Sequence, residues 1–197
     1  MPQSFSKRKE LGSMKKLVLY TSVDGNTDAV AHAIADRIGA DTARLVRVKR
    51  VKGFGFFNNL KLHSEVIRHK KPDIFPFKWD PRDYDLIFIG TPVWFDSYNP
   101  VYNTLFNVIK IYDRKVALFS CGEKEDTKAL TKLSNDWLKE SVVLDTKHCV
   151  EPIWCDEESE TEAILKDMAD WAEKVSERAE KMIEQEELER RKTIYKY

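Results

Sequence analysis

Five short apolar runs alternate along the chain with longer segments in which apolar residues recur at helical spacing. The runs are compact, rich in branched side chains and bounded by turn residues, which is typical of strands buried on both faces of a sheet. We expect strands over residues 15–21, 42–48, 84–94, 114–122 and 147–154.

The intervening segments have the period of amphipathic helices. Between residues 26 and 39 the apolar positions are 30, 31, 34, 35 and 38, and Gly39 stands where a helix is expected to end. The same spacing predicts helices over 26–39, 100–112, 125–140 and from Ser159 to about Arg191. Strands that alternate with helices in this way predict a doubly wound α/β fold, with a five-stranded parallel sheet and helices on both faces.

Three parts of the chain depart from this alternation. Residues 49–83 are basic, aromatic and broken by Gly and Pro, and a short helix is expected around 56–69. Residues 1–13 are expected to form a disordered basic arm or to be an expression-tag remnant, which leaves a domain over 14–178. Residues 179–197 are a charged helical extension that either projects into solvent or pairs with another chain, as in a homodimer.

Composition limits the class of protein. The chain has 33 Lys and Arg against 33 Asp and Glu, but bases gather in 42–72 and acids in 156–190. These regions either steer a charged partner or form opposite solvated faces. No nucleic-acid motif accompanies the basic region, so no nucleic-acid partner is expected. The sequence has 3 cysteines with no Cys-x-x-Cys spacing and no apolar run of membrane-spanning length, which predicts a cytoplasmic protein without a membrane span.

The loops after the first, third and fourth expected strands carry the candidate chemistry. In a doubly wound sheet these loops meet at the carboxyl edge, where ligands bind. They comprise residues 21–27, 91–99 and 120–126. The four histidines are scattered without ligand spacing, and no metal site is expected.

The first loop combines hydroxyl and amide side chains with Gly25 and leads directly into a helix. Backbone N–H groups at a helix N-terminus favour an anion, so this loop is a candidate phosphate site. The alternative is an ordinary helix start capped by Asn26 or Thr27. The loop fits neither a Walker A motif nor a dinucleotide-binding motif, which favours a mononucleotide.

The second loop places Trp94, Phe95 and Tyr98 after the most apolar strand. Aromatic residues there favour stacking on a planar ligand, although they could also fold back on the core or contact a partner. The third loop has Gly122 for close backbone approach. Cys121 beside it is either a reactive thiol or a buried, inert one.

The motif order resembles that of the flavodoxin family. Ser22-Val23-Asp24-Gly25-Asn26-Thr27 is similar to the phosphate loop of that family, which has the form Ser/Thr-x-Thr-Gly-x-Thr. "YDLIFIGTPVW" (84–94) and "KVALFSCGE" (115–123) are similar to the strands and flavin loops that follow. The insert at 52–74 resembles a segment of the short-chain bacterial and archaeal flavodoxins, and the likeness covers roughly residues 14–175.

This resemblance implies the strand order 2-1-3-4-5 and an FMN cofactor. The phosphate would lie on Ser22, Gly25, Asn26 and Thr27, and the ring between the second and third loops, with Trp94 as the best stacking candidate. The implied function is electron transfer to a redox partner protein, or reduction of a small quinone-type acceptor, with no catalytic acid or base. The expected cofactor-binding residues are Thr21, Ser22, Asp24, Gly25, Asn26, Thr27, Thr91, Pro92, Val93, Trp94, Phe95, Tyr98, Ser120, Cys121 and Gly122.

Asp24 departs from the family pattern, which usually has Thr at this position. At about 4 Å and an effective dielectric of about 20, each like-charge pair costs on the order of 4 kcal/mol before screening. Asp24 would therefore weaken FMN binding unless it points to solvent or caps the helix itself. If flavin binding is lost, the chain is instead a flavodoxin-fold binding or regulatory module.

Overall fold

Five parallel strands form one sheet in the order β2-β1-β3-β4-β5, which confirms the predicted fold class. The computed structural model describes residues 14–49, 56–123, 128–155 and 157–194, so the expected arm at 1–13 lies outside it. The strands are β1 (Lys16–Tyr20), β2 (Asp41–Arg44), β3 (Leu86–Pro92), β4 (Lys115–Cys121) and β5 (Val142–Cys149). The helices are α1 (Asn26–Ile38), α2 (Phe56–Ile67), α3 (Val101–Val108), α4 (Lys128–Trp137) and α5 (Glu158–Ile194), with short 3₁₀ turns η1 (Pro81–Asp83) and η2 (Pro152–Trp154).

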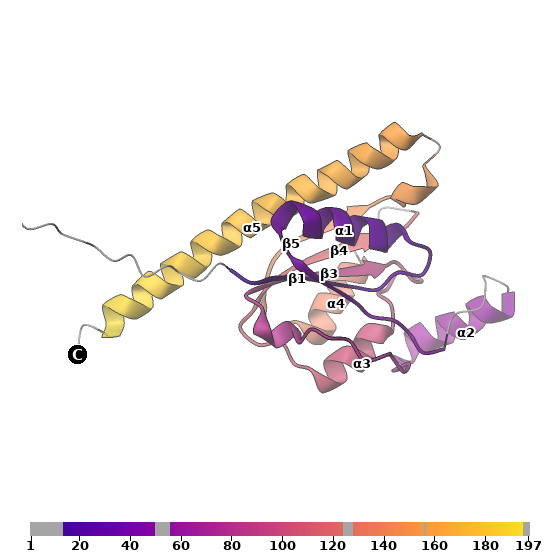
Figure 1. The fold of residues 1–197 in the computed structure, drawn as a ribbon. Helices are drawn as coiled ribbons and strands as arrows, with labels where there is room; N and C mark the ends of the chain where they lie inside the picture. Colours follow the sequence, from indigo (N-terminus) through magenta and orange to yellow (C-terminus); the bar gives the residue numbers. More distant parts are fainter. Residues whose placement is uncertain (1–13, 50–55, 124–127, 156, 195–197) are drawn as a thin grey trace, which may run out of the picture.

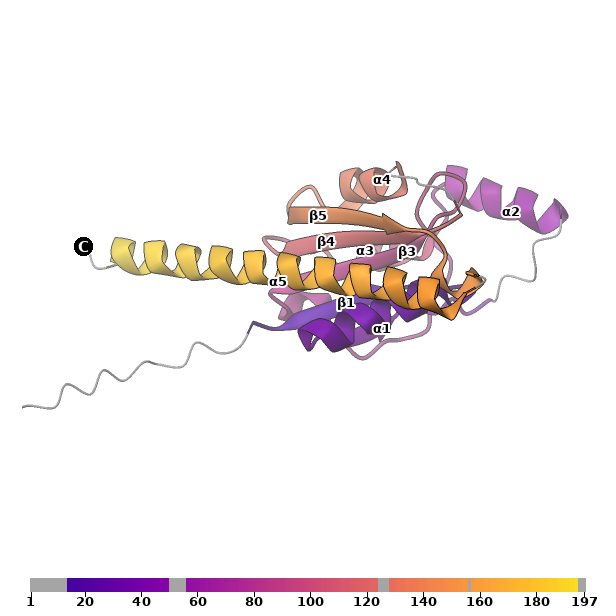
Figure 2. The same cartoon turned by 90° about the horizontal axis from the view of Figure 1, so that it is seen from above.

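Helices cover both faces of the sheet (Figures 1 and 2). Successive strand residues point to opposite faces, so one strand contributes to two cores. Val18 and Phe88 pack in the cluster that includes α1 and α5, whereas Leu19 and Ile89 pack in the cluster that includes α3 and α4. Every residue of β3 and β4 is buried, as continuous apolar strands predict.

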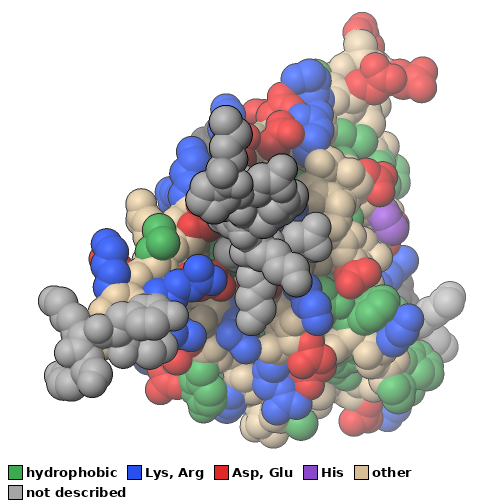
Figure 3. All heavy atoms as spheres, turned by 60° about the vertical axis from the view of Figure 1, so that its left-hand side comes forward, with side chains coloured by type: hydrophobic (Ala, Val, Ile, Leu, Met, Phe, Trp, Pro, Cys, Tyr) green, Lys and Arg blue, Asp and Glu red, His purple; other side chains and the backbone are tan. Residues whose placement is uncertain are grey.

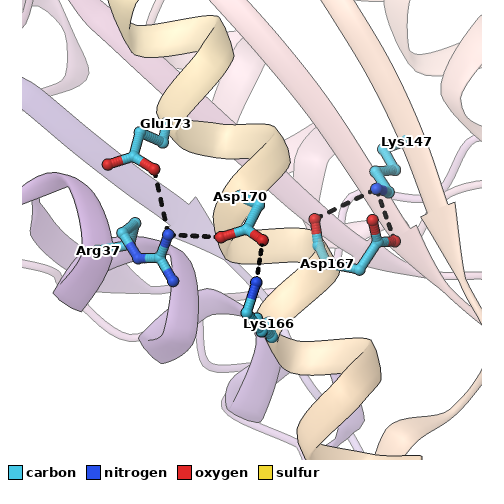
Figure 4. Close-up of polar contacts among 6 residues, drawn as sticks. All are labelled: Arg37, Lys147, Lys166, Asp167, Asp170 and Glu173. Atoms are coloured by element: carbon cyan, nitrogen blue, oxygen red, sulfur yellow. Dashed lines mark hydrogen bonds and ion pairs between the residues drawn. The ribbon is translucent and has the colours of Figure 1, made fainter.

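Helix α5 is held against the sheet by an aromatic contact and by ion pairs. The Trp171 ring meets the Phe88 ring edge-on, with centroids 5.6 Å apart. Figure 4 shows Arg37 of α1 between Asp170 (2.5 Å) and Glu173 (3.1 Å) of α5. The helix then continues beyond the sheet (Figure 2), and the proposed boundary between residues 178 and 179 falls inside this continuous helix.

Two strand predictions were wrong in their bounds. The fifth strand covers Val142–Cys149 rather than 147–154, because Pro152 ends extended pairing and begins η2. This strand lies at the sheet edge, so only some of its residues are buried and its apolar signal is weak. The second strand ends at Arg44, and Arg47 instead forms an isolated antiparallel bridge with Ile74.

The expected helices are present with different ends, and α5 extends to Ile194, beyond the expected end at about Arg191. Helix α3 stops at Val108, four residues before the expected end, and α2 stops at Ile67. Residues 124–127, where the fourth helix was expected to begin, lie outside the described residues. Helix α2 stands apart from the sheet at the edge toward which the strands point (Figure 1), tied to the body by an ion pair between Glu65 and Arg47 (2.8 Å).

A cavity of about 640 Å³ lies at the opposite, amino edge of the sheet. Its lining includes Lys16, Lys78, Asp41 and Asp80. Figure 3 turns this side forward and shows basic and acidic side chains interspersed over it. The cavity is therefore remote from the three loops. Among the described residues, no helix has the length and apolar character needed to cross a membrane.

Gly90 at the centre of β3 is required by the packing of Phe119. A Cβ at position 90 would lie 2.1 Å from Cζ of that ring. We expect Gly90→Ala to lower the free energy of unfolding by about 1–3 kcal/mol through overpacking, as measured by urea denaturation. Combining it with Phe119→Leu should cost less than the sum of the two single effects, whereas strictly additive effects would contradict the proposed collision.

Candidate functional site

The three loops meet at the carboxyl edge of the sheet. Pairing between β3 and β4 continues to Pro92 and Cys121, and Val93 N then donates to the Cys121 carbonyl (2.9 Å). Thr21 N donates to the Gly90 carbonyl (3.1 Å), which ties the first loop to β3. The loops are thus fixed to adjacent strands by backbone hydrogen bonds.

The first loop folds around Gly25, which has a positive φ of 106° and precedes α1. Gly25 N donates to Ser22 Oγ (3.1 Å), and Asn26 N donates to Asp24 Oδ1 (3.1 Å). Asp24 is exposed, and its carboxylate accepts the amide of the first residue of α1, although the N-cap position itself is occupied by Gly25. The alternative in which Asn26 or Thr27 caps α1 is wrong, because neither side chain accepts a capping hydrogen bond.

Two buried polar atoms at the start of α1 have no oxygen or nitrogen partner within the part of the chain that the structure describes. They are Nδ2 of Asn26 and Oγ1 of Thr27, in side chains that are 1% and 0% exposed. The Asn26 amide is oriented by its oxygen, which accepts from Ile153 N (2.9 Å). Buried polar groups are nearly always hydrogen bonded. These two donors are therefore suited to a ligand that carries acceptor oxygens.

The turn η2 closes against the first loop. A Cβ at Gly25 would lie 3.1 Å from Cδ1 of Ile153, and the positive φ adds strain for any larger residue. The sequence does not reveal this contact, because residues 147–154 read as a strand. Pro152 is the signal that could have indicated a turn there.

Charges of both signs surround the first loop. Arg44 Nη1 lies 3.1 Å from Asp28 Oδ1, and Arg44 Nη2 donates to the Ser22 carbonyl (3.3 Å). This cation was not singled out in the sequence. Its position could have been found from the parallel pairing of β1 and β2, which sets Arg44 opposite Tyr20, just before the loop.

An acidic group lies on the other side of the loop. The pKa of Glu151 is raised, first by burial and then by the charges of Asp24 and Glu123. These three carboxyl groups come from the first loop, the third loop and the segment before η2. An anionic ligand at the start of α1 would therefore meet repulsion as well as the two free donors.

The second loop contains a tight turn that presents Phe95. Trp94 and Ser97 exchange backbone hydrogen bonds (2.7 and 2.9 Å), and Phe95 and Asp96 between them both have positive φ, at 50° and 56°. Lys132 of α4 donates to the Asp96 carbonyl (2.6 Å). A left-handed conformation is unfavourable for an aromatic residue, and such strain is commonly found at functional sites.

The three aromatic residues of this loop have different surroundings. Phe95 is 44% exposed, whereas Trp94 is only 7% exposed. His63 of α2, which the sequence did not single out, lies beside Phe95 with ring centroids 5.0 Å apart. Tyr98 is buried in the α3–α4 core, where its hydroxyl bonds to Asp136 (2.8 Å). The pKa of Tyr98 is raised, first by burial and then by this hydrogen bond.

The remaining predicted residues shape the loops from within. Thr91 Oγ1 accepts a hydrogen bond from Asn99 N (3.0 Å), which closes the second loop. In the third loop, Ser120 Oγ lies 2.9 Å from Nδ1 of His148, and a Cβ at Gly122 would lie 3.0 Å from Cβ of Val93. Residues 124–126 of this loop fall outside the described part of the chain. Within that part, no cluster of His, Cys, Asp and Glu could hold a metal ion.

Residues 15–149 match the family described as Flavodoxin. The chain belongs to the flavodoxin family. No curated protein sequence shows significant similarity to it.

This flavodoxin-family chain is similar to solved structures of flavoproteins. A flavoprotein from Lactobacillus acidophilus, crystallised in complex with FMN, is 26% identical, with a TM-score of 0.59 over 69% of this chain and 93% of that one. A flavoprotein candidate from Bacteroides eggerthii is 20% identical, with a TM-score of 0.57 over 79% of this chain and 98% of that one. The second likeness supports the fold alone.

The raised pKa of Glu151 predicts how stability depends on pH. The carboxyl group of Glu151 binds its proton more tightly in the folded chain than in the unfolded chain. The protonated group therefore stabilises the fold at a pH below the usual pKa of glutamate, and this stabilisation is lost as the pH rises through the pKa of the folded state. We expect Glu151→Gln to raise the Tm at pH 7 and to change it little at pH 4. The exposed Glu162→Gln on α5 is the control. A lower Tm at pH 7 for Glu151→Gln would overturn this account.

Proposed function

We propose that this chain binds FMN at the carboxyl edge of its sheet and acts as a flavodoxin-like redox protein. The observation that carries the proposal is the pair of buried donors, Asn26 Nδ2 and Thr27 Oγ1, which have no oxygen or nitrogen partner among the described residues. They lie at the start of α1, where the helix dipole also favours an anion. The FMN complex of the Lactobacillus acidophilus flavoprotein supports the same ligand.

The residues present fit this cofactor in part. Asn26 and Thr27 would donate to the phosphate, and Gly25 allows the chain to approach it closely. Phe95 is the aromatic residue whose ring is exposed, so we assign stacking on the flat ring system to Phe95 rather than to Trp94. Tyr98 is left out of the site because it is buried between α3 and α4. The other predicted residues hold the loops in place.

Bound FMN would supply the electron-transfer chemistry. The chain's own groups would bind and orient it, and the strained turn at Phe95 and Asp96 would fix an aromatic surface that excludes water from one side. We propose that electrons pass to a redox partner protein or to a small quinone-type acceptor. A stepwise anaerobic reduction followed by absorbance, with each acceptor class then added in turn, would separate these two activities.

A second candidate is a flavodoxin-fold regulatory module without flavin. It is favoured by Asp24, which already occupies the Asn26 amide at 3.1 Å, and by the acidic surroundings of Glu151. Because Asp24 is exposed, solvent screens its repulsion toward a phosphate. At about 4 Å in water each like-charge pair costs on the order of 1 kcal/mol. We therefore favour weakened binding over lost binding.

Thr27→Val tests the FMN site directly. Removing a buried hydroxyl that has no oxygen or nitrogen partner among the described residues should leave the stability of the apoprotein unchanged or raise it. A hydrogen bond to a charged group contributes about 1.5–3 kcal/mol, so FMN affinity should fall by about ten- to a hundredfold. Flavin fluorescence titration measures the affinity, and Thr146→Val on an exposed part of β5 is the matched control. Equal affinities for both variants would refute a phosphate role for Thr27.

Asp24→Thr separates the two candidate functions. A phosphate of FMN carries nearly two negative charges, so relief of repulsion should raise the affinity by roughly tenfold. The same titration reports it. If the unmodified chain binds no FMN and Asp24→Thr does, the regulatory module is the better description. If neither protein binds FMN, the redox proposal fails.

A further inference from the structure

All 3 cysteines of the chain lie at the carboxyl edge of the sheet. Cys121 ends β4, Cys149 ends β5, and Cys155 follows η2. All three are free thiols, the first two buried and the third partly exposed. This places sulfur chemistry beside the three loops, although nothing in the proposed flavin site requires it.

Two of these thiols are in direct contact. Cys149 Sγ donates to Cys121 Sγ at 3.4 Å, and the two residues are directly paired in the parallel register of β4 and β5. Neighbouring strands are about 4.7–4.9 Å apart, which lies within the Cα separation of about 4.4–6.8 Å that a disulfide spans. The sulfurs would need to approach by about 1.4 Å from 3.4 Å to reach bonding distance.

The backbone at both residues is already fixed. The Cys121 carbonyl accepts from Val93 N (2.9 Å), and the Cys149 carbonyl accepts from Gly122 N (3.3 Å). Both side chains belong to the core cluster that includes α1 and α5, so they point to the same face of the sheet. Side-chain rotation is therefore the main movement that bond formation requires.

We propose that Cys121 and Cys149 form a redox-active thiol pair that a small peroxide converts to an intramolecular disulfide. In the first step the Cys149 sulfur attacks the peroxide oxygen and becomes a sulfenic acid, and the thiol proton leaves with the departing oxygen as water or an alcohol. In the second step the Cys121 sulfur attacks that sulfenic sulfur. The S–S bond forms, and the hydroxyl leaves with the Cys121 proton as water. The two thiols lose two electrons in total, and the peroxide O–O bond gains them.

The burial of Cys121 and Cys149 limits the size of the oxidant that can reach their sulfurs. Cys149 is 7% exposed and Cys121 is 2% exposed, so a peroxide can reach the pair more readily than a bulky disulfide. The pKa of Cys121 is raised, first by its hydrogen bond with Cys149 and then by burial, which disfavours its thiolate and argues against Cys121 as the thiol that attacks the peroxide. We therefore assign it the second step, in which its contact with the Cys149 sulfur brings it to the sulfenic acid. Cys155 is the more accessible sulfur and would react with larger reagents.

The pair also adjoins the first loop. Cys121 is close enough to Thr27 and Asp24 for the hydroxyl to lower, and the carboxylate to raise, the pKa of its thiol. Moving the Cys121 sulfur toward Cys149 would weaken this contact between the Cys121 thiol and the Thr27 hydroxyl. A change in FMN affinity on oxidation would rest on the proposed function, whereas the disulfide itself would not.

The test treats the folded full chain with hydrogen peroxide, blocks remaining thiols by alkylation, and maps cysteines by mass spectrometry after digestion. We expect a cross-link between the Cys121 and Cys149 peptides, with loss of two hydrogens, that dithiothreitol reverses. Cys155→Ser should retain the cross-link, and Cys149→Ser should abolish it. Oxidised glutathione should modify Cys155 and leave the pair reduced.

Several results would overturn the proposal. These are two alkylated thiols after peroxide treatment, separate over-oxidation of each sulfur, or a disulfide that includes Cys155. If Cys149→Ser fails to fold, by circular dichroism, Cys149→Ala and the Cys155→Ser protein still decide the question. The experiment is run with and without added FMN, so failure of flavin binding leaves the cross-link result intact.

Discussion

Parallel hydrogen bonding among β1, β3, β4 and β5 brings the carboxyl ends of these strands to one edge, and every functional proposal for this chain depends on that placement. The hydrophobic effect enforces it, because β3 and β4 are buried along their whole length and must be covered on both faces. Gly90 and Phe119 show how tightly the central strands pack. The loops depend on this rigid base, and the turn at Phe95 and Asp96 in the second loop is conformationally strained.

The sequence predicted the central architecture because the apolar runs of β1, β3 and β4 are continuous and their burial is complete. It misplaced β5 because an edge strand buries only part of its side chains, so Val142 and Val143 gave no clear strand signal. Of the site, the first loop was predictable from its residue types. The closure by Ile153 was not, because it depends on a contact between segments distant in the sequence, and Arg44 could be placed only from the pairing of β1 with β2.

The aromatic residues of the second loop also differ from what the sequence predicted. The sequence analysis favoured Trp94 for stacking, yet the turn between Trp94 and Ser97 exposes the ring of Phe95, and Tyr98 packs in the α3–α4 core. Side-chain direction at consecutive loop positions is set by φ and ψ, which composition does not specify. Asp24 is exposed, which was one of its two expected outcomes, and it accepts the amide of Asn26 while Gly25 occupies the N-cap position.

The strained turn at Phe95 has a consequence for recognition. Its unfavourable backbone energy is incurred when the chain folds, and Lys132 and the paired backbone of Trp94 and Ser97 hold the turn in that state. A flat ligand that binds at this edge therefore contacts an aromatic surface, the Phe95 ring, that is already ordered. Little loop entropy is left to lose on association, so selectivity would come from shape and charge rather than from induced closure.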